Sequence, residues 1–158
     1  MIQINRKILV NKPVEDVWKV LFGRFTEVGT WVTGVYKSRP ATKEENCDRV
    51  CDTFTGKLYE KIIYKDEKNH TFRVGVRGLP SFVKKFEGGW TLKKISNSST
   101  EAAFELIIET KGIIGAIMQI PMKSKLTKGL NTLRDDLVTW VETGKVSSKK
   151  HQELNKKR

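Results

Sequence analysis

Hydrophobic positions divide the chain into a short amphipathic helix near the start, a run of strand-like segments, and a long closing helix. Apolar residues stand at alternate positions at the N-terminus, as in a half-buried strand: Ile2, Ile4, Ile8 and Val10. Pro13 suits the first turn of a helix. An apolar stripe at helical spacing follows it: Val14, Val17, Trp18, Leu21, Phe22 and Phe25. A second short helix or turn is predicted over 26–30.

The middle of the chain is rich in β-branched and aromatic residues, separated by turn residues. We predict strands over 32–38, 48–53, 58–64, 72–77, 86–95 and 101–109. Gly88 and Gly89 interrupt one of these strands and predict a bulge or a close approach of two backbones.

Five apolar residues recur at spacings of three and four near the end of the chain, which predicts a long helix: Leu126, Leu130, Leu133, Leu137 and Val141. Pro121 should kink this helix or start it anew. Gly144 is a natural C-cap. The segment 112–115, which contains two glycines, is interpreted as a helix-entry loop or a mobile mouth loop.

The length of 158 residues favours one domain, which we place at 1–144. Residues 145–158 hold six Lys or Arg and one Glu, and we expect this basic tail to be solvated or frayed. No apolar stretch reaches the roughly 18 residues of a membrane span, and no signal-peptide pattern opens the chain, so a cytoplasmic location is expected.

The net charge of +12 is the compositional outlier. A basic surface attracts nucleic acid, anionic lipid or acidic partners, or it simply keeps a protein soluble. The lysines of the tail lack interleaved aromatic residues, so nucleic acid is not favoured as a partner. An anionic membrane surface remains a candidate partner. The sequence does not indicate an oligomeric state.

The chain offers few groups for catalysis. Its two histidines, His70 and His151, stand apart and fit surface roles. If Cys47 and Cys51 share a strand, their Cα atoms are about 13 Å apart, whereas a disulfide needs about 4.4 to 6.8 Å. Two reduced cysteines are therefore expected. Neither a metal site nor a cofactor is predicted, and no catalytic residue is assigned.

The order of elements resembles the START-like helix-grip superfamily (SRPBCC), in particular its polyketide cyclase/dehydrase and lipid-transport branch. The resemblance is carried by the opening strand, the Lys12-Pro13-Val14-Glu15-Asp16-Val17-Trp18 helix start, Trp31, Gly56, the Phe72-x-Val74-x-Val76 strand, Trp90 and the Leu-rich terminal helix. It implies an α+β fold in which a bent antiparallel sheet of about seven strands wraps around a long C-terminal helix. It also implies an internal cavity for lipids, polyketides, sterols or similar molecules.

We therefore expect a protein that binds or transfers a small hydrophobic ligand and is not an enzyme. The alternatives are a polyketide cyclase or dehydratase that uses the same cavity, and an interaction module whose cavity has collapsed. The predicted ligand-binding residues are Tyr59, Tyr64, Arg73, Arg77, Trp90, Phe104, Met118, Met122, Leu126 and Leu130.

For two pairs of these residues, the arginines and the tyrosines, the sequence allows two orientations or roles. If Phe72, Val74 and Val76 face the core, Arg73 and Arg77 face solvent, which the alternation favours. If the sheet turns that face inward, the two arginines would hold a carboxylate or phosphate head group. Similarly, the hydroxyls of the two tyrosines would orient a ligand, or the rings would simply pack.

Overall fold

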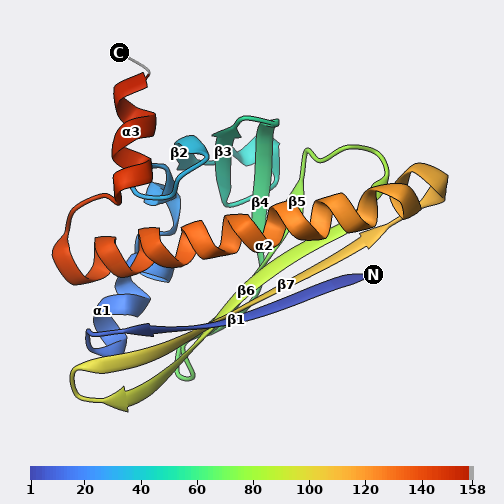
Figure 1. Cartoon of the computed structure of the whole chain (residues 1–158). Coiled ribbons are helices and arrows are strands. Elements are labelled where there is room, and N and C mark those ends of the chain that lie inside the picture. Colours follow the sequence, from blue (N-terminus) through green and yellow to red (C-terminus); the bar gives the residue numbers. More distant parts are fainter. Residues whose placement is uncertain (157–158) are drawn as a thin grey trace.

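The computed structural model describes residues 1–156, and Figure 1 shows how its elements are arranged. The strands are β1 (Ile2–Val10), β2 (Val35–Pro40), β3 (Arg49–Thr53), β4 (Gly56–Asp66), β5 (Thr71–Arg77), β6 (Val83–Ser96) and β7 (Ser99–Thr110). The helices are α1 (Val14–Trp18), the π-helical turn η1 (Lys19–Gly23), the 3₁₀ helices η2 (Phe25–Thr30) and η3 (Lys43–Glu45), α2 (Gly112–Thr143) and α3 (Ser148–Lys156). Lys157 and Arg158, which end the expected basic tail, lie outside the described residues.

The seven strands form one antiparallel sheet in the order β1-β7-β6-β5-β4-β3-β2. Helix α2 lies across this sheet, and α1 to η2 close one end of the space between them (Figure 1). This arrangement confirms the predicted α+β fold, with a sheet of seven strands and a long helix near the C-terminus. The predicted short helix over 26–30 corresponds to η2.

Two strand details differ from the prediction or refine it. Strand β2 begins at Val35 and not at Val32, because the backbone N–H groups of Thr33 and Gly34 donate to side-chain carboxylates instead of joining the sheet. Gly89 marks a close approach: a Cβ there would lie 2.9 Å from the carbonyl oxygen of Phe72. The register of β6 against its neighbours is regular at this point, so no bulge is present.

Helix α2 runs without a break from Gly112 to Thr143 and contains Pro121. The helix therefore does not start anew at the proline. Pro121 has no N–H, and this leaves the carbonyl of Ile117 without its helical donor. Both residues are exposed, so water can serve that carbonyl. Residues 112–115 form the first turn of α2, so both loop interpretations of this segment are wrong. Gly144 caps the helix with φ 70°, as predicted.

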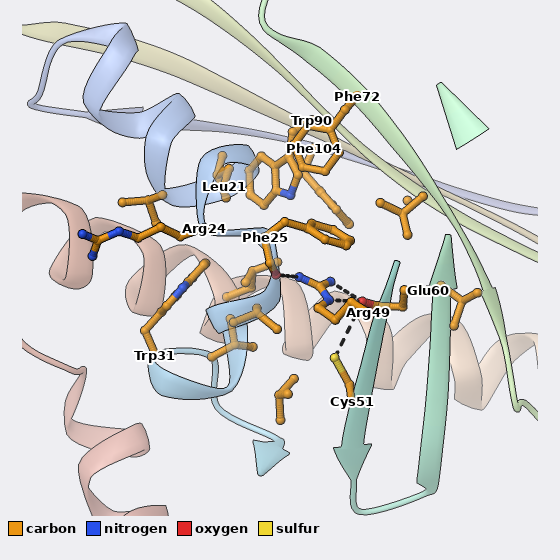
Figure 2. Close-up of a pocket in the computed structure, with 18 of the residues that line it drawn as sticks. Leu21, Arg24, Phe25, Trp31, Arg49, Cys51, Glu60, Phe72, Trp90 and Phe104 are labelled. Carbon is orange, nitrogen blue, oxygen red and sulfur yellow. Dashed lines mark hydrogen bonds and ion pairs between the residues drawn. The ribbon is translucent and has the colours of Figure 1, made fainter. Parts of the chain in front are cut away.

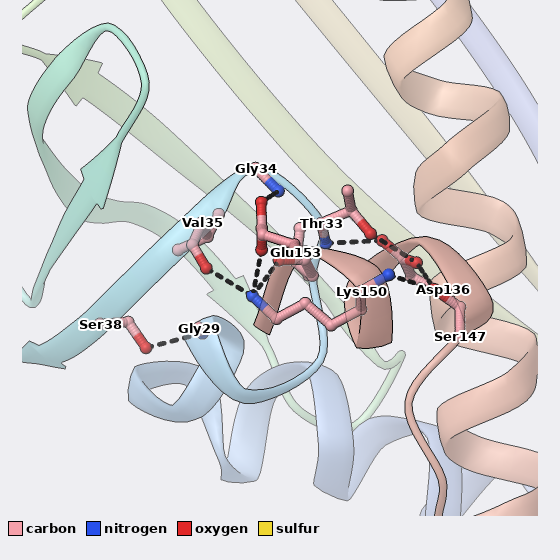
Figure 3. Close-up of polar contacts among 10 residues, drawn as sticks. Gly29, Thr33, Gly34, Val35, Ser38, Asp136, Ser147, Lys150 and Glu153 are labelled. Carbon is pink, nitrogen blue, oxygen red and sulfur yellow. Dashed lines mark hydrogen bonds and ion pairs between the residues drawn. The ribbon is translucent and has the colours of Figure 1, made fainter. Parts of the chain in front are cut away.

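The expectation of a solvated, frayed tail is wrong for residues 148–156. They form α3, and the side chain of Lys150 is completely buried. Its ammonium group donates to the carbonyl oxygens of Val32 (2.9 Å) and Val35 (2.7 Å) and to the carboxylate of Glu153 (2.8 Å) (Figure 3). A buried ammonium is stable only when its donors are satisfied in this way. Helix α3 is thus fixed to the segment between η2 and β2.

A second contact ties α3 to α2. Asp136 of α2 is buried and accepts hydrogen bonds from the backbone N–H and the hydroxyl of Thr33, at 2.7 and 3.0 Å. The hydroxyl of Ser147 donates to the same carboxylate. One buried carboxylate therefore joins α2, the start of α3 and the η2–β2 connection (Figure 3).

The apolar interior contains two clusters. The larger cluster lies between the sheet and the segment from α1 to η2, and its buried members include Trp18, Phe25, Trp31, Phe72, Trp90 and Leu137. The smaller cluster lies under the first half of α2 and consists of Ile2, Ile4, Leu106, Ile108 and Leu130. Among the described residues, no helix is long and apolar enough to cross a membrane.

Candidate functional site

A cavity of about 190 Å³ lies inside the larger apolar cluster (Figure 2). Its walls come from η1 and η2, from the inner face of β2 to β7, and from α2, which contributes Leu133. Aromatic rings form much of this wall: Phe25, Trp31, Phe72, Phe86, Trp90 and Phe104. The cavity is therefore mostly apolar and rich in aromatic surface.

The register of the strands decides which side chains reach the cavity. Phe72, Val74 and Val76 alternate along β5 and all line it. Residues paired across an antiparallel ladder point to the same face of the sheet. Val76 pairs with Glu60 on β4, and Glu60 pairs with Arg49 on β3. The register thus places one carboxylate and one guanidinium on the inner, apolar face.

Arg49 and Glu60 form an ion pair in the cavity wall. The Nε and Nη2 atoms of Arg49 both contact Oε2 of Glu60, and Nη1 donates to the carbonyl oxygen of Phe25. The guanidinium carbon lies 3.7 Å from the centroid of the Phe25 ring, a cation–π contact. The side chains are 11% and 15% exposed, so the pair lies in a poorly solvated environment. Each charge is compensated by the other.

Cys51 adds a third polar group to this corner of the cavity. Its thiol donates to Oε2 of Glu60 at 3.7 Å (Figure 2). Burial, reinforced by the negative charge of Glu60, raises the pKa of the thiol to about 12. A thiol with that pKa is almost entirely protonated near neutral pH and is a poor nucleophile. Cys51 therefore acts here as a small, weakly polar wall residue.

Packing of the aromatic residues shapes the remaining wall. The rings of Trp90 and Phe104 lie 4.8 Å apart, and Phe25 meets Phe72 edge-on at 6.1 Å. Gly88 leaves space for Phe104, since a Cβ at that glycine would lie 3.3 Å from the ring. These side chains come from three strands and from η2, so the cavity depends on the tertiary fold.

Two of the ten predicted ligand-binding residues, Trp90 and Phe104, line the cavity. Arg73 lies on the outer face of the sheet and pairs with Glu105 at 2.7 Å. Hydrogen bonds from Arg73 and then from Gln3 lower the pKa of Glu105. Arg77 donates to the carbonyl oxygen of Glu45 at 2.7 Å. Both arginines therefore face away from the core, as the alternation along the strand predicted. Neither lines the cavity.

The other predicted residues also lie outside the cavity wall. Tyr59 is stacked beneath Arg77, whose guanidinium carbon is 5.7 Å from the ring centroid, and Tyr64 is half exposed. Leu130 belongs to the smaller apolar cluster, and Met122 and Leu126 pack against it. Met118 is partly buried one turn earlier on α2. A role for these residues in ligand binding stays a prediction.

The sequence reasoning missed Arg49, Cys51 and Glu60. A signal for them existed in the turn between β3 and β4. Phe54 and Thr55 form a two-residue turn, so Thr53 pairs with Gly56, and this register carries Arg49 directly opposite Glu60. Opposite charges that face each other on the same side of the sheet as Val76 and Val74 would have indicated an internal ion pair.

The described part of the chain contains no group of three or more His, Cys, Asp or Glu side chains that could hold a metal ion. His70 contacts Glu15 at 2.8 Å and meets Trp18 edge-on, away from Cys51 and Glu60. Both cysteines are free.

Comparison with known proteins gives matches at the level of structure only. No family model and no curated protein sequence matches the chain. An aromatase/cyclase named Zhui, from a Streptomyces species, superimposes with a TM-score of 0.74 at 9% identity, over 89% of this chain and 93% of that one. A START superfamily protein from Mycobacterium smegmatis gives 0.70 at 14% identity, over 90% and 99%.

A third solved structure is a complex with small aromatic molecules. Norcoclaurine synthase from Thalictrum flavum, in complex with dopamine and hydroxybenzaldehyde, superimposes with a TM-score of 0.69 at 14% identity, over 92% of this chain and 89% of that one. At such low identity these similarities establish architecture and nothing finer. The seven-stranded sheet, the long closing helix and these superpositions together show that the chain has the START-like helix-grip fold.

Proposed function

We propose that the chain binds a small, uncharged, largely aromatic or aliphatic ligand in the cavity beside Arg49 and Glu60. The observation that carries this proposal is a mostly apolar cavity with one polar corner, the arrangement typical of small-molecule sites. Burial of apolar ligand surface would supply the affinity. The polar corner would orient a hydroxyl or carbonyl group of the ligand.

The size of the cavity limits the ligand. Its volume of about 190 Å³ is below the 300 to 1,000 Å³ that is usual for drug-sized ligands. It is closer to the roughly 150 Å³ of an engineered cavity that holds benzene. We therefore infer a ligand of one or two rings, or a short acyl chain. A sterol or a long polyketide would require the wall to move outward.

The charges of the polar corner limit the ligand further. Arg24 also lines the cavity, but its side chain is half exposed to solvent and its Nε lies 4.0 Å from a carboxylate oxygen of Glu27. Because Arg49 and Glu60 neutralise each other, the buried corner of the cavity offers a charged ligand no unpaired counter-ion. Moving a charged group from water into an apolar environment without a counter-ion is energetically costly. A neutral ligand avoids that cost and can still exchange a hydrogen bond with the carboxylate of Glu60 or the guanidinium of Arg49. Neutral molecules should therefore bind better than acids of the same shape.

Titration with 1-naphthol and 1-naphthoate would test both limits, with quenching of tryptophan fluorescence as the signal, since Trp31 and Trp90 line the cavity. We expect 1-naphthol to bind with micromolar affinity, about −8 kcal/mol, and 1-naphthoate to bind at least tenfold more weakly. Val76→Phe should abolish binding by filling the polar corner. Ile95→Phe, on the exposed end of β6, is the matched control.

Equal binding of the two probes would contradict the neutral-ligand proposal. Binding that survives in Val76→Phe would place the probe outside the cavity. If neither probe binds and no small apolar molecule accompanies the purified protein in native mass spectrometry, the cavity is not a ligand site. The chain would then be an interaction module.

One observation favours a second candidate, an enzyme that acts on the bound ligand. Glu60 is the carboxylate in the cavity wall, and a carboxylate in an apolar site is suited to proton transfer. Among the structural neighbours are an aromatase/cyclase and a synthase, although at low identity. Cyclisation or dehydration that is lost in Glu60→Gln, while 1-naphthol still binds, would support the enzyme. Turnover unchanged in Glu60→Gln would exclude this role for Glu60.

A further inference from the structure

The first turns of α2 expose a cluster of isoleucines. Ile113, Ile114, Ile117 and Ile120 are 81%, 65%, 68% and 82% exposed, whereas the apolar residues elsewhere that are comparably exposed are dispersed over the chain. Single exposed apolar side chains are ordinary, but a contiguous apolar patch on a soluble protein usually marks a binding surface. We call these four residues the isoleucine patch.

The patch faces away from the core. Ile113, Ile117 and Ile120 recur at spacings of four and three, which places them on one stripe of the helix, with Ile114 at its border. The opposite stripe faces the sheet: Gly115 is buried against Thr110, and Met122 packs on the smaller cluster. This part of α2 is therefore apolar on both faces, and the sheet covers only one of them. Figure 1 shows the first turns of α2 at one end of the molecule.

The charged residues that flank the patch on α2 and at its start are all basic. Lys111 precedes the patch, and Lys123, Lys125 and Lys128 follow it; all four are exposed, and none forms an ion pair with another described residue. Glu109, at the end of β7, pairs with Lys84. No Asp or Glu occurs from Lys111 to Arg134. An apolar helical face bordered by unpaired lysines is the composition of helices that lie in the interface of anionic membranes. The lysines would meet lipid phosphates and carboxylates while the isoleucines enter the acyl region.

We propose that the isoleucine patch docks the protein on the surface of an anionic lipid membrane. The charge pattern selects this occupant. A second copy of the chain would bring the same four lysines against their equivalents, since an isologous contact pairs a surface with itself. A cationic rim around an apolar face is instead complementary to anionic head groups over hydrocarbon. The proposal does not depend on which ligand the cavity binds.

The test is co-sedimentation of the full chain with vesicles of phosphatidylcholine alone and with vesicles that also contain phosphatidylserine. We expect binding to the anionic vesicles only. Ile117→Ser/Ile120→Ser should reduce that binding at least tenfold. Each of Lys123→Gln, Lys125→Gln and Lys128→Gln should reduce it about fivefold, the effect of about one basic residue near an anionic surface. Raising the salt to about 1 M, where charges are screened beyond about 3 Å, should also release the protein.

Matched controls separate the patch from overall hydrophobicity and charge. Ile63→Ser/Ile95→Ser removes two exposed isoleucines elsewhere, and Lys68→Gln/Lys93→Gln/Lys94→Gln removes three exposed lysines elsewhere. Both should bind anionic vesicles like the wild type. A second patch variant, Ile113→Ser/Ile114→Ser, provides an independent test if the first one melts at a lower temperature.

Three results would overturn the proposal. The first is equal sedimentation with both kinds of vesicle, and the second is unchanged binding by both patch variants. The third is a wild-type dimer in analytical ultracentrifugation that becomes a monomer in Ile117→Ser/Ile120→Ser, which would make the patch a self-association face. Binding of 1-naphthol to the cavity would be unaffected by any of these results, so the two proposals can fail separately.

Discussion

At the scale of single residues, the environment of Cys51 decides its chemistry. Its thiol pKa is about 12, raised by burial and by Glu60. At pH 8 only about one molecule in ten thousand would then carry the reactive thiolate. Cys47 lies outside the strands and is only partly buried. We expect a disulfide reagent to modify one thiol quickly in the folded protein and both thiols in urea. Cys47→Ser should remove the fast phase, and a fast reaction that persists in this variant would show that Cys51 is accessible.

The ion pair in the cavity wall makes a second residue-scale prediction. Removing one partner leaves a poorly solvated charge without compensation, so Glu60→Gln should destabilise the protein by about 2 to 4 kcal/mol. Arg49→Met/Glu60→Gln removes both charges and should recover part of that loss. Urea unfolding of the two single variants and the double variant measures the coupling. If the two single losses simply add, the pair is not an interacting unit.

At the scale of elements, α3 is held by a buried lysine. Lys150→Met would remove the buried ammonium that donates to the carbonyl oxygens of Val32 and Val35 and to the carboxylate of Glu153, and should cost about 3 kcal/mol. Lys145→Met, at an exposed position, is the matched control and should stay within about 0.5 kcal/mol of the wild type. Since both carbonyls belong to residues of the cavity wall, Lys150→Met should also weaken ligand binding. Wild-type stability in this variant would show that α3 is not anchored through Lys150.

The short helix η3 gives the fold a defined dependence on pH. A hydrogen bond from Arg39 and then one from the backbone of Thr42 lower the pKa of Glu45 from 4.5 to about 2. A lowered carboxyl pKa stabilises the folded state above the unfolded value, and the contribution is lost as the pH falls. The difference in unfolding free energy between wild type and Glu45→Gln should therefore be constant above about pH 5 and shrink between about pH 4.5 and about pH 2. A difference that is equal at pH 6 and pH 3 would contradict this assignment.

Elements whose stability comes from apolar burial were predictable, because burial leaves a period in the sequence. The strands and the long helix of 126–141 have that period. Helix α3 does not: its buried anchor is the amine of Lys150, and a lysine in a basic segment is usually interpreted as solvated. Of the two outcomes predicted at Pro121, a new helix start is wrong: α2 continues through the proline, where the exposed carbonyl of Ile117 can bond water.

The candidate site was harder to predict than the fold. Alternation along β5 indicated that Arg73 and Arg77 face away from the core, and their contacts agree. The turn at Phe54 and Thr55 indicates that Arg49 lies opposite Glu60, but the direction in which this pair faces depends on the register of β4 against β5. Similarly, Leu130 and Leu133 belong to one helical stripe, yet only Leu133 reaches the cavity. Sequence periodicity finds the buried face of an element but not the place where packing is left incomplete.

At the scale of the whole molecule, one stretch of α2 packs in the core and a neighbouring stretch borders the cavity. Leu137 is fully buried in the larger cluster, and Leu133 lines the cavity one turn earlier. Leu137→Ala should cost about 2 to 5 kcal/mol, the usual range for a packed core leucine. Leu133→Ala should cost clearly less, because its side chain already borders unfilled space and has fewer contacts to lose.

The same pair of variants links stability to function. Leu133→Ala enlarges the cavity, so it should shift selectivity from one- and two-ring probes toward three-ring probes such as anthracene. Leu137→Ala should lower the melting temperature without changing that selectivity. Urea unfolding measures the loss of stability, and fluorescence titration with 1-naphthol and anthracene measures the change in selectivity on the same samples. Equal losses of stability in the two variants would mean that Leu133 is packed like any core residue and that α2 does not border an open cavity.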